Sequence, residues 1–165
     1  MEELELVKKA GMGDVDAFTE LYRGIYKDLY RTAFYMLGNP HDAEDVVSET
    51  VMDAFASIGQ LREAGAFRAW IFRILAVKCS RKRREYLKRT EELPEDLAEK
   101  NSFVEDVMVR QAFAKLPKED RMILSLHVFG GYKSSEIAAM LSRNENTVRS
   151  KKSRALTKLA AMLKA

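Results

Sequence analysis

The sequence has 165 residues, 47% hydrophobic and 32% charged, with only three prolines, a composition that favours helix and one ordinary core or two small ones. A single cysteine, Cys79, excludes an internal disulfide. No apolar run approaches the roughly 20 residues that cross a bilayer, and the acidic N-terminus is unlike a signal peptide. We therefore expect a soluble, cytoplasmic protein without membrane insertion. The blocks 1–60, 61–90, 91–120 and 121–165 carry net charges of −7, +8, −5 and +7, which predicts contact with a polyanion at two separated places.

Apolar residues recur every three or four positions over 14–37, which predicts a long helix with one buried face. This pattern stops at Gly38, and the next two residues suit the start of a second helix, with Asn39 as its cap and Pro40 in its first position. The second helix, about 40–58, is expected to bury the apolar residues on one of its sides: Ala43, Val46, Val47, Val51, Ala54, Phe55 and Ile58.

Four acidic residues occupy the other side of this second helix. Asp42, Asp45, Glu49 and Asp53 follow one another at three- or four-residue spacing, where like charges repel and do not stabilise their own helix. Taken alone, such a stripe is typical of a solvated face.

A third helix is predicted over about 65–88, with Phe67, Ile71, Ile74 and Leu75 packed inward. It ends in four adjacent cations at 81–84, which favour contact with phosphates over a merely solvated helix end. Trp70 and Phe67 are compatible with stacking on an unpaired base or with packing between helices.

Residues 90–103 are acidic and poor in large apolar side chains, so we expect a linker there. Shorter helical patterns follow over about 104–116, 118–129, 134–141 and 145–164. The predicted fold is therefore all-α, with a small helical domain over 1–89 and a second one, containing a helix-turn-helix, over 104–165. Because the linker joins them, we expect the two domains to have no fixed separation in the free protein.

The segment 134–153 is typical of a helix-turn-helix. Its first helix offers Ile137 and Leu141 to the core, the turn follows at 142–144, and Asn144 is suited to cap the second helix. No acidic residue follows Val148, whereas five basic residues lie within 149–158. Arg and Lys bind phosphates or guanine, and Ser, Thr and Asn contact base edges, so this pattern predicts DNA binding in a major groove.

With these motifs in order, the whole chain resembles the extracytoplasmic-function (ECF) class of bacterial RNA polymerase sigma factors. Phe18-Thr-Glu-Leu-Tyr22 and Asp42-Ala-Glu-Asp-Val-Val-Ser-Glu49 resemble the opening helix and the polymerase-clamp-binding segment of a sigma-2 domain. Phe67-Arg-Ala-Trp-Ile-Phe-Arg-Ile74 resembles its segment for promoter melting and minus-10 reading. Thr147-Val-Arg-Ser150 within the helix-turn-helix resembles the minus-35-reading part of a sigma-4 domain.

The resemblance implies that RNA polymerase core and promoter DNA are partners, with docking on the β′ clamp helices and the β flap. The implied polymerase-binding residues on the second helix are Asp42, Glu44, Asp45, Val46, Ser48, Glu49 and Met52. The implied minus-10 residues are Phe67, Trp70, Arg73, Lys78, Arg81, Lys82 and Arg84. The implied minus-35 residues are Asn146, Thr147, Arg149, Ser150, Lys151, Ser153, Arg154 and Lys158. Many members of the class are also held inactive by an anti-sigma protein.

The sequence departs from the class at several motif positions. Val77 and Arg81 stand where many members have Asn and Asp, so the base sequence of the minus-10 element is not predicted for this chain. Ser48 replaces the usual Gln of the clamp-binding segment, and Ser142 replaces a Gly at the turn of the helix-turn-helix.

Two other functions are alternatives to that of a sigma factor. A stand-alone helix-turn-helix regulator that binds DNA as a dimer explains the second half but leaves the acidic second helix and the basic third helix without a role. A nucleic-acid enzyme lacks support, because no His/Cys/acid metal set, phosphate loop or nucleophile constellation is present. We therefore expect a protein with no catalytic residues, no metal and no cofactor.

Overall fold

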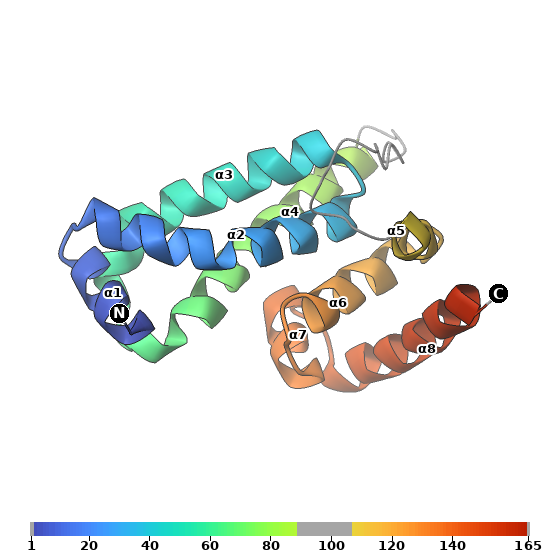
Figure 1. Cartoon of the computed structure of the whole chain (residues 1–165). Helices are drawn as coiled ribbons and strands as arrows, with labels where there is room; N and C mark the ends of the chain where they lie inside the picture. The colour runs from blue at the N-terminus through green and yellow to red at the C-terminus, as the bar shows by residue number, and fades with distance from the viewer. Residues whose placement is uncertain (1, 89–106, 165) are drawn as a thin grey trace.

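The computed structural model describes residues 2–88 and 107–164, and all regular elements in these two ranges are helical. The first half contains α1 (Glu3–Gly11), α2 (Val15–Leu37), α3 (Pro40–Ser57), the short 3₁₀ turns η1 (Ile58–Gln60) and η2 (Ala64–Ala66), and α4 (Phe67–Lys88). The second half contains α5 (Val107–Ala114), α6 (Lys118–Val128), α7 (Ser134–Leu141) and α8 (Glu145–Lys164) (Figure 1). The predicted all-α class is confirmed, and the predicted linker 90–103 lies outside the described residues.

Local signals place the helix ends in the first half. The carboxylate of Asp14 accepts a hydrogen bond of 3.1 Å from the amide of Ala17 and so caps α2. Gly38 ends α2 with a φ of 73°, a left-handed conformation that favours glycine. The side chain of Asn39 then accepts from the amide of Asp42 at 3.0 Å, with Pro40 in the first turn of α3, as predicted.

The helices of the first half enclose a core that the periodicity largely anticipated. One face of α2 is buried in its first half, whereas every residue from Thr32 to Leu37 is buried, because the second half also packs on this end of the helix. Tyr30 and Phe34 stack within α2 with ring centroids 6.1 Å apart. Phe55 is the exception among the expected core residues of α3, because it is 39% exposed. Its ring contacts that of Phe18 edge to face. The helix α1 was not predicted; it packs on α2, η1 and η2, and its buried residues are Val7 and Ala10.

The second half is built around α6, whose residues Ile123, Leu124 and Leu126 are fully buried. Both α7 and α8 pack against α6 and against each other. Val148 and Ala155 from α8 are fully buried in this arrangement. The closely packed pair of α7 and α8 is the helix-turn-helix predicted from the sequence.

The two halves share an apolar interface. The helices α5 and α6 pack on α2, and α7 packs on α4 (Figure 1). Tyr35 of α2 forms a three-ring cluster with Phe113 and Phe129 of the second half, with its centroid 4.6 Å from each of them and theirs 5.8 Å apart. Phe72 of α4 meets Tyr132 edge to face at 5.8 Å.

Two polar contacts add to this interface. The hydroxyl of Tyr132 donates to the carbonyl of Arg68 at 3.2 Å, and the guanidinium of Arg83 donates to the carbonyl of Lys118 at 3.0 Å. Burial raises the pKa of Tyr132 to about 12, so its hydroxyl remains a donor at neutral pH. The expectation that the two halves have no fixed separation is therefore wrong for this structure, in which aromatic rings of both halves pack together. Helical periodicity shows which face of a helix is apolar but not which helix of the other half covers it.

Candidate polymerase and nucleic-acid interfaces

The acidic side of α3 forms an exposed strip. Glu44, Asp45, Ser48 and Glu49 are all exposed, and Met52 adds an apolar side chain that is 70% exposed. The predicted contact residue Val46 is different: it is 1% exposed and belongs to the core. The expectation that Val46 offers apolar contact to a partner is wrong, because Val46 lies on the inward face of α3 and its side chain packs in the core.

Asp42 lies at the edge of this strip and is largely shielded. Its side chain is 16% exposed, and one carboxylate oxygen is buried without a hydrogen bond. Burial raises the pKa of Asp42, and the nearby ammonium of Lys82, 3.8 Å away, opposes that rise. Asp42 is thus less accessible to a partner than Asp45 or Glu49.

Lys78 and Lys82 of α4 point at α3, not at solvent. The ammonium of Lys78 lies 2.7 Å from a carboxylate oxygen of Asp53 and 3.9 Å from one of Glu49. Asp53 belongs to the acidic side of α3 but is not one of the predicted polymerase-binding residues. Two cations assigned to DNA are therefore paired with the acidic strip assigned to the polymerase.

The remaining predicted minus-10 residues differ in how exposed their side chains are. Arg73, Arg81 and Arg84 are exposed along α4. Trp70 is half-buried and its ring lies 6.2 Å from that of Phe67. Phe67 is 1% exposed, so of its two readings the structure favours packing, and base stacking by Phe67 would require the core to open.

The basic run at 81–84 contains one buried member. Arg83 is 8% exposed, and burial together with the neighbouring cation Arg121 lowers its pKa to about 10. Its guanidinium still carries its charge at neutral pH, but it bonds the backbone of the second half and does not face solvent. Sequence adjacency alone suggested four equivalent cations, whereas helical rotation turns this one inward.

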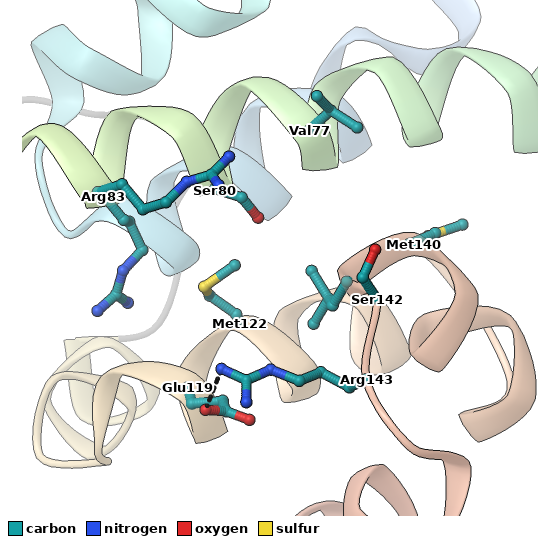
Figure 2. A pocket seen from close by; sticks show the side chains of 10 residues that line it. Val77, Ser80, Arg83, Glu119, Met122, Met140, Ser142 and Arg143 are labelled. Carbon is teal, nitrogen blue, oxygen red and sulfur yellow. Dashed lines mark ion pairs between the residues drawn. The ribbon is translucent and has the colours of Figure 1, made fainter.

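A cavity of about 470 Å³ lies between α4 and the α6–α7 region, and Figure 2 shows residues of both halves around it. Val77, which departs from the class pattern, lines it and is 38% exposed. The carboxylate of Glu119 binds the guanidinium of Arg143 at 3.0 Å across the lower wall in that view. The full lining consists of Val77, Ser80, Arg83, Arg84, Glu119, Met122, Met140, Leu141, Ser142 and Arg143.

The turn between α7 and α8 has a strained residue. Ser142 has a φ of 54° and a ψ of 49°, in the left-handed region where many members of the class have Gly. Two residues later, the side chain of Asn144 accepts a hydrogen bond of 2.8 Å from the amide of Asn146, as its predicted capping role requires. The turn thus sets the angle at which α8 leaves α7.

The outer face of α8 carries the predicted minus-35 residues. A shallow hollow there is lined by Arg149, Ser150, Ser153 and Arg154. The exposed members of the predicted set are Asn146, Thr147, Arg149, Ser150, Ser153, Arg154 and Lys158. The side chains on this face are thus donors and cations gathered on one helix, suited to a major groove.

Two cations of α8 have partners within the chain. The guanidinium of Arg149 pairs with the carboxylate of Glu145 and also donates a hydrogen bond of 3.1 Å to the side-chain oxygen of Asn146. Lys151 is 30% exposed and its ammonium lies 3.8 Å from Glu119. Lys151 therefore faces α6 more than solvent, unlike Arg154 and Lys158.

Neither a metal site nor a membrane span appears in the described part of the chain. Within 2–88 and 107–164, no three His, Cys, Asp or Glu side chains gather where a metal ion would bind. No helix in the same ranges is both long enough and apolar enough to cross a membrane. Cys79 is buried, and this burial raises the pKa of its thiol.

Two family models match the chain: "Sigma-70 region 2" over residues 21–90 and "Sigma-70, region 4" over residues 106–159. The ECF RNA polymerase sigma factor SigM of Mycobacterium tuberculosis H37Rv is 30% identical over 98% of this chain and 84% of its own length. The RNA polymerase sigma factor SigV of Bacillus subtilis 168 is 31% identical over 79% of this chain and 81% of its own.

Solved structures share the fold. The sigma factor RpoE of Bartonella quintana, solved with the anti-sigma factor NepR, has a TM-score of 0.70 at 23% identity and covers 92% of this chain and 99% of its own. CnrH, solved with the cytosolic domain of CnrY, has a TM-score of 0.67 at 24% identity, with 98% and 97% covered.

These matches define a transcription initiation factor with the two helical regions in the order seen here. The chain belongs to the ECF sigma factors of the sigma-70 family, with a sigma-2 and a sigma-4 region. Its function is that of a sigma factor: it directs RNA polymerase to promoters for the initiation of transcription.

Proposed function

We propose that this sigma factor binds core polymerase through the exposed strip of α3 and contacts promoter DNA through α4 and α8. The proposed units are a sigma-2 domain over 1–89, a linker over 90–103 and a sigma-4 domain over 104–165. The chain supplies promoter recognition and strand opening, while the polymerase performs the chemistry, so no catalytic group of its own is required.

The observation that carries the proposal is the composition of the outer face of α8. Arg154 and Lys158 are exposed and without an ion pair among the described residues, and Ser150 and Ser153 lie between the basic side chains. After Val148 no acid interrupts the face. Such a helix, presented by a helix-turn-helix, matches the way a recognition helix enters the major groove.

The exposed strip of α3 is acidic, whereas the outer face of α8 is basic. Asp45 and Glu49 offer exposed carboxylates, and Met52 offers exposed apolar surface beside them. An acidic strip with one apolar side chain suits a basic helical partner, for which we propose the β′ clamp helices of the polymerase. Ser48 and Glu44 complete the proposed contact, and Val46 is removed from it.

On the minus-10 side, the exposed cations of α4 are proposed to contact phosphates. Arg73, Arg81 and Arg84 carry this role, and the half-buried Trp70 is the proposed aromatic for an unpaired base. Phe67 supports Trp70 from the core.

Further partners belong to the same proposal. The sigma-4 domain is proposed to dock on the β flap, and the site of action is the cytoplasm. RpoE of Bartonella quintana was solved with an anti-sigma factor, and we propose that a protein of that kind is a partner of this chain as well. A stand-alone dimeric regulator is not favoured, because the region 2 match accounts for the first half, which such a regulator would leave unused.

The test is transcription with purified components. Core polymerase is supplied with this protein on fragmented genomic DNA, and the 5′ ends of the transcripts are sequenced. We expect start sites that share two upstream sequence elements about two helical turns apart, and that disappear when Arg149, Arg154 and Lys158 are all replaced by Ala. Start sites identical to those of core polymerase alone would contradict the proposal.

A further inference from the structure

Lys78 lies beneath two carboxylates that face outward from α3. Its ammonium is 2.7 Å from Asp53 and 3.9 Å from Glu49. The side chain of Lys78 is 14% exposed, whereas those of Asp53 and Glu49 are each 59% exposed. A partner that approaches α3 therefore meets the carboxylates first, and the lysine is covered by them.

The same pattern occurs farther along the α3–α4 contact. The ammonium of Lys82 lies 3.8 Å from Asp42, with both side chains largely shielded. The neighbouring cations of α4, Arg81 and Arg84, are exposed and have no ion pair among the described residues. The pairing thus distinguishes Lys78 and Lys82, which face carboxylates of α3, from Arg81 and Arg84, which are exposed.

A neutralised lysine contributes little to DNA binding. The salt dependence of DNA affinity counts the phosphates that a protein neutralises, because each contact releases condensed counterions. A lysine that already shares its charge with two carboxylates has to leave them before it replaces a counterion. Those carboxylates also repel the phosphate backbone, which adds to the same effect.

We propose that Asp53 and Glu49 are positioning residues that withhold Lys78 from DNA in the free protein and release it when basic side chains of a partner occupy these carboxylates on α3. The inference rests on the proposed docking of polymerase through α3. Occupation by a cationic partner weakens the hold of each carboxylate on Lys78, so docking and DNA binding strengthen one another. By linkage, DNA that binds Lys78 strengthens docking by the same factor.

The first experiment uses the free full-length protein and contains no polymerase. Binding to a labelled duplex is measured by fluorescence anisotropy from 50 to 200 mM salt for the wild type, Asp53→Asn and Glu20→Gln. Glu20 is an exposed acid on α2 and gives the matched control for removing one negative charge. We expect Asp53→Asn to steepen the slope of log affinity against log salt by about one, an extra loss of roughly 3.5-fold over this range, and Glu20→Gln to leave the slope unchanged.

The double variant Asp53→Asn/Lys78→Ala identifies the cation responsible, and we expect it to return to the wild-type slope. A merely structural role of Asp53 does not change the number of phosphates contacted, so the slope separates positioning from folding. An Asp53→Asn slope equal to that of the wild type, or a steeper slope that persists without Lys78, would overturn the inference.

The second experiment tests release in the holoenzyme. With core polymerase bound, we expect Lys78→Ala to reduce the salt slope of promoter binding by about one. An unchanged slope in a holoenzyme that forms normally overturns the release step. Absence of a complex between core polymerase and the wild-type protein is a different result, because it contradicts the proposed function itself while leaving the free-protein measurement interpretable.

Discussion

Ser142 holds the turn of the helix-turn-helix in a left-handed conformation, with a φ of 54°. An L-residue with a Cβ pays about 1–2 kcal/mol in this region, which Gly avoids. We expect Ser142→Gly to raise the free energy of unfolding by about 1 kcal/mol in urea denaturation.

The control for this change is Ser150→Gly, because Ser150 is exposed in the middle of α8, where Gly lowers helix stability by about 0.5–1 kcal/mol. If both substitutions destabilise the protein alike, Ser142 is not strained.

Arg154 and Lys158 lie on the same exposed face of α8 but are expected to act differently on DNA. An arginine that reads a base contributes about 1–3 kcal/mol of discrimination at one position, whereas a phosphate-contacting lysine strengthens binding to all sequences alike. We expect Arg154→Ala to relax preference within the minus-35 element, and Lys158→Ala to weaken all promoters equally and lower the salt slope by about one. Competition among promoter variants for the holoenzyme measures both, and loss of preference from Lys158→Ala alone would reverse the assignment.

At the scale of elements, α3 is the proposed docking helix, and its exposed carboxylates provide the test. We expect Asp45→Lys with Glu49→Lys to weaken core polymerase binding by about 1–2 kcal/mol, on the order of tenfold, because exposed ion pairs contribute about 0.2–1 kcal/mol each and reversal adds repulsion. Asp42 is omitted, since its shielded side chain is largely committed to α4.

The matched control is Glu20→Lys with Glu63→Lys, two exposed acids outside α3 with the same change in net charge. Equal losses in the two double variants, measured by co-elution or anisotropy, would show that net charge alone matters and would remove α3 from the interface.

Sequence periodicity was sufficient for the long helices and insufficient for contacts between elements. The buried face of α2 and the cap at Asn39 follow from spacing and residue type alone. The helix α1 was missed because Val7 and Ala10, its two buried residues, make too short a pattern. Which acids of α3 pair with Lys78 and Lys82 depends on the rotation of α3 against α4, and that rotation has no local signal.

The interface between the halves depends on close packing near Gly130. A Cβ added there would lie 2.6 Å from the carbonyl oxygen of Leu126 and 2.7 Å from the ring of Tyr132, which packs on Phe72 of the first half. We expect Gly130→Ala to lower the free energy of unfolding by about 1–3 kcal/mol, because the backbone oxygen has no room to move and Tyr132 is displaced.

Gly24 is the matched control, since it lies within α2 and a Cβ there meets nothing within 4 Å. We expect Gly24→Ala to stabilise the protein by about 0.5–1 kcal/mol. Chemical denaturation of both variants decides the matter, and a stabilising Gly130→Ala would contradict the packing described for Tyr132.

At the scale of the whole molecule, the contact between the two halves limits how far apart the two DNA-binding surfaces lie in the free protein. A compact chain of 165 residues has a radius of gyration of about 15 Å. Promoter elements two helical turns apart are separated by roughly 70 Å. The α4 and α8 surfaces therefore do not reach both elements while the halves remain in contact, and docking of each half on a large rigid enzyme supplies the spacing in advance.

The central claim, that promoter specificity belongs to the complex with polymerase, is tested most directly by electrophoretic mobility shift of one promoter fragment at one stated salt concentration, with and without core polymerase. We predict weak binding without sequence preference by the protein alone and tight, sequence-specific binding once core polymerase is added. Tight, sequence-specific binding by the protein alone, above all as a dimer, would contradict the account.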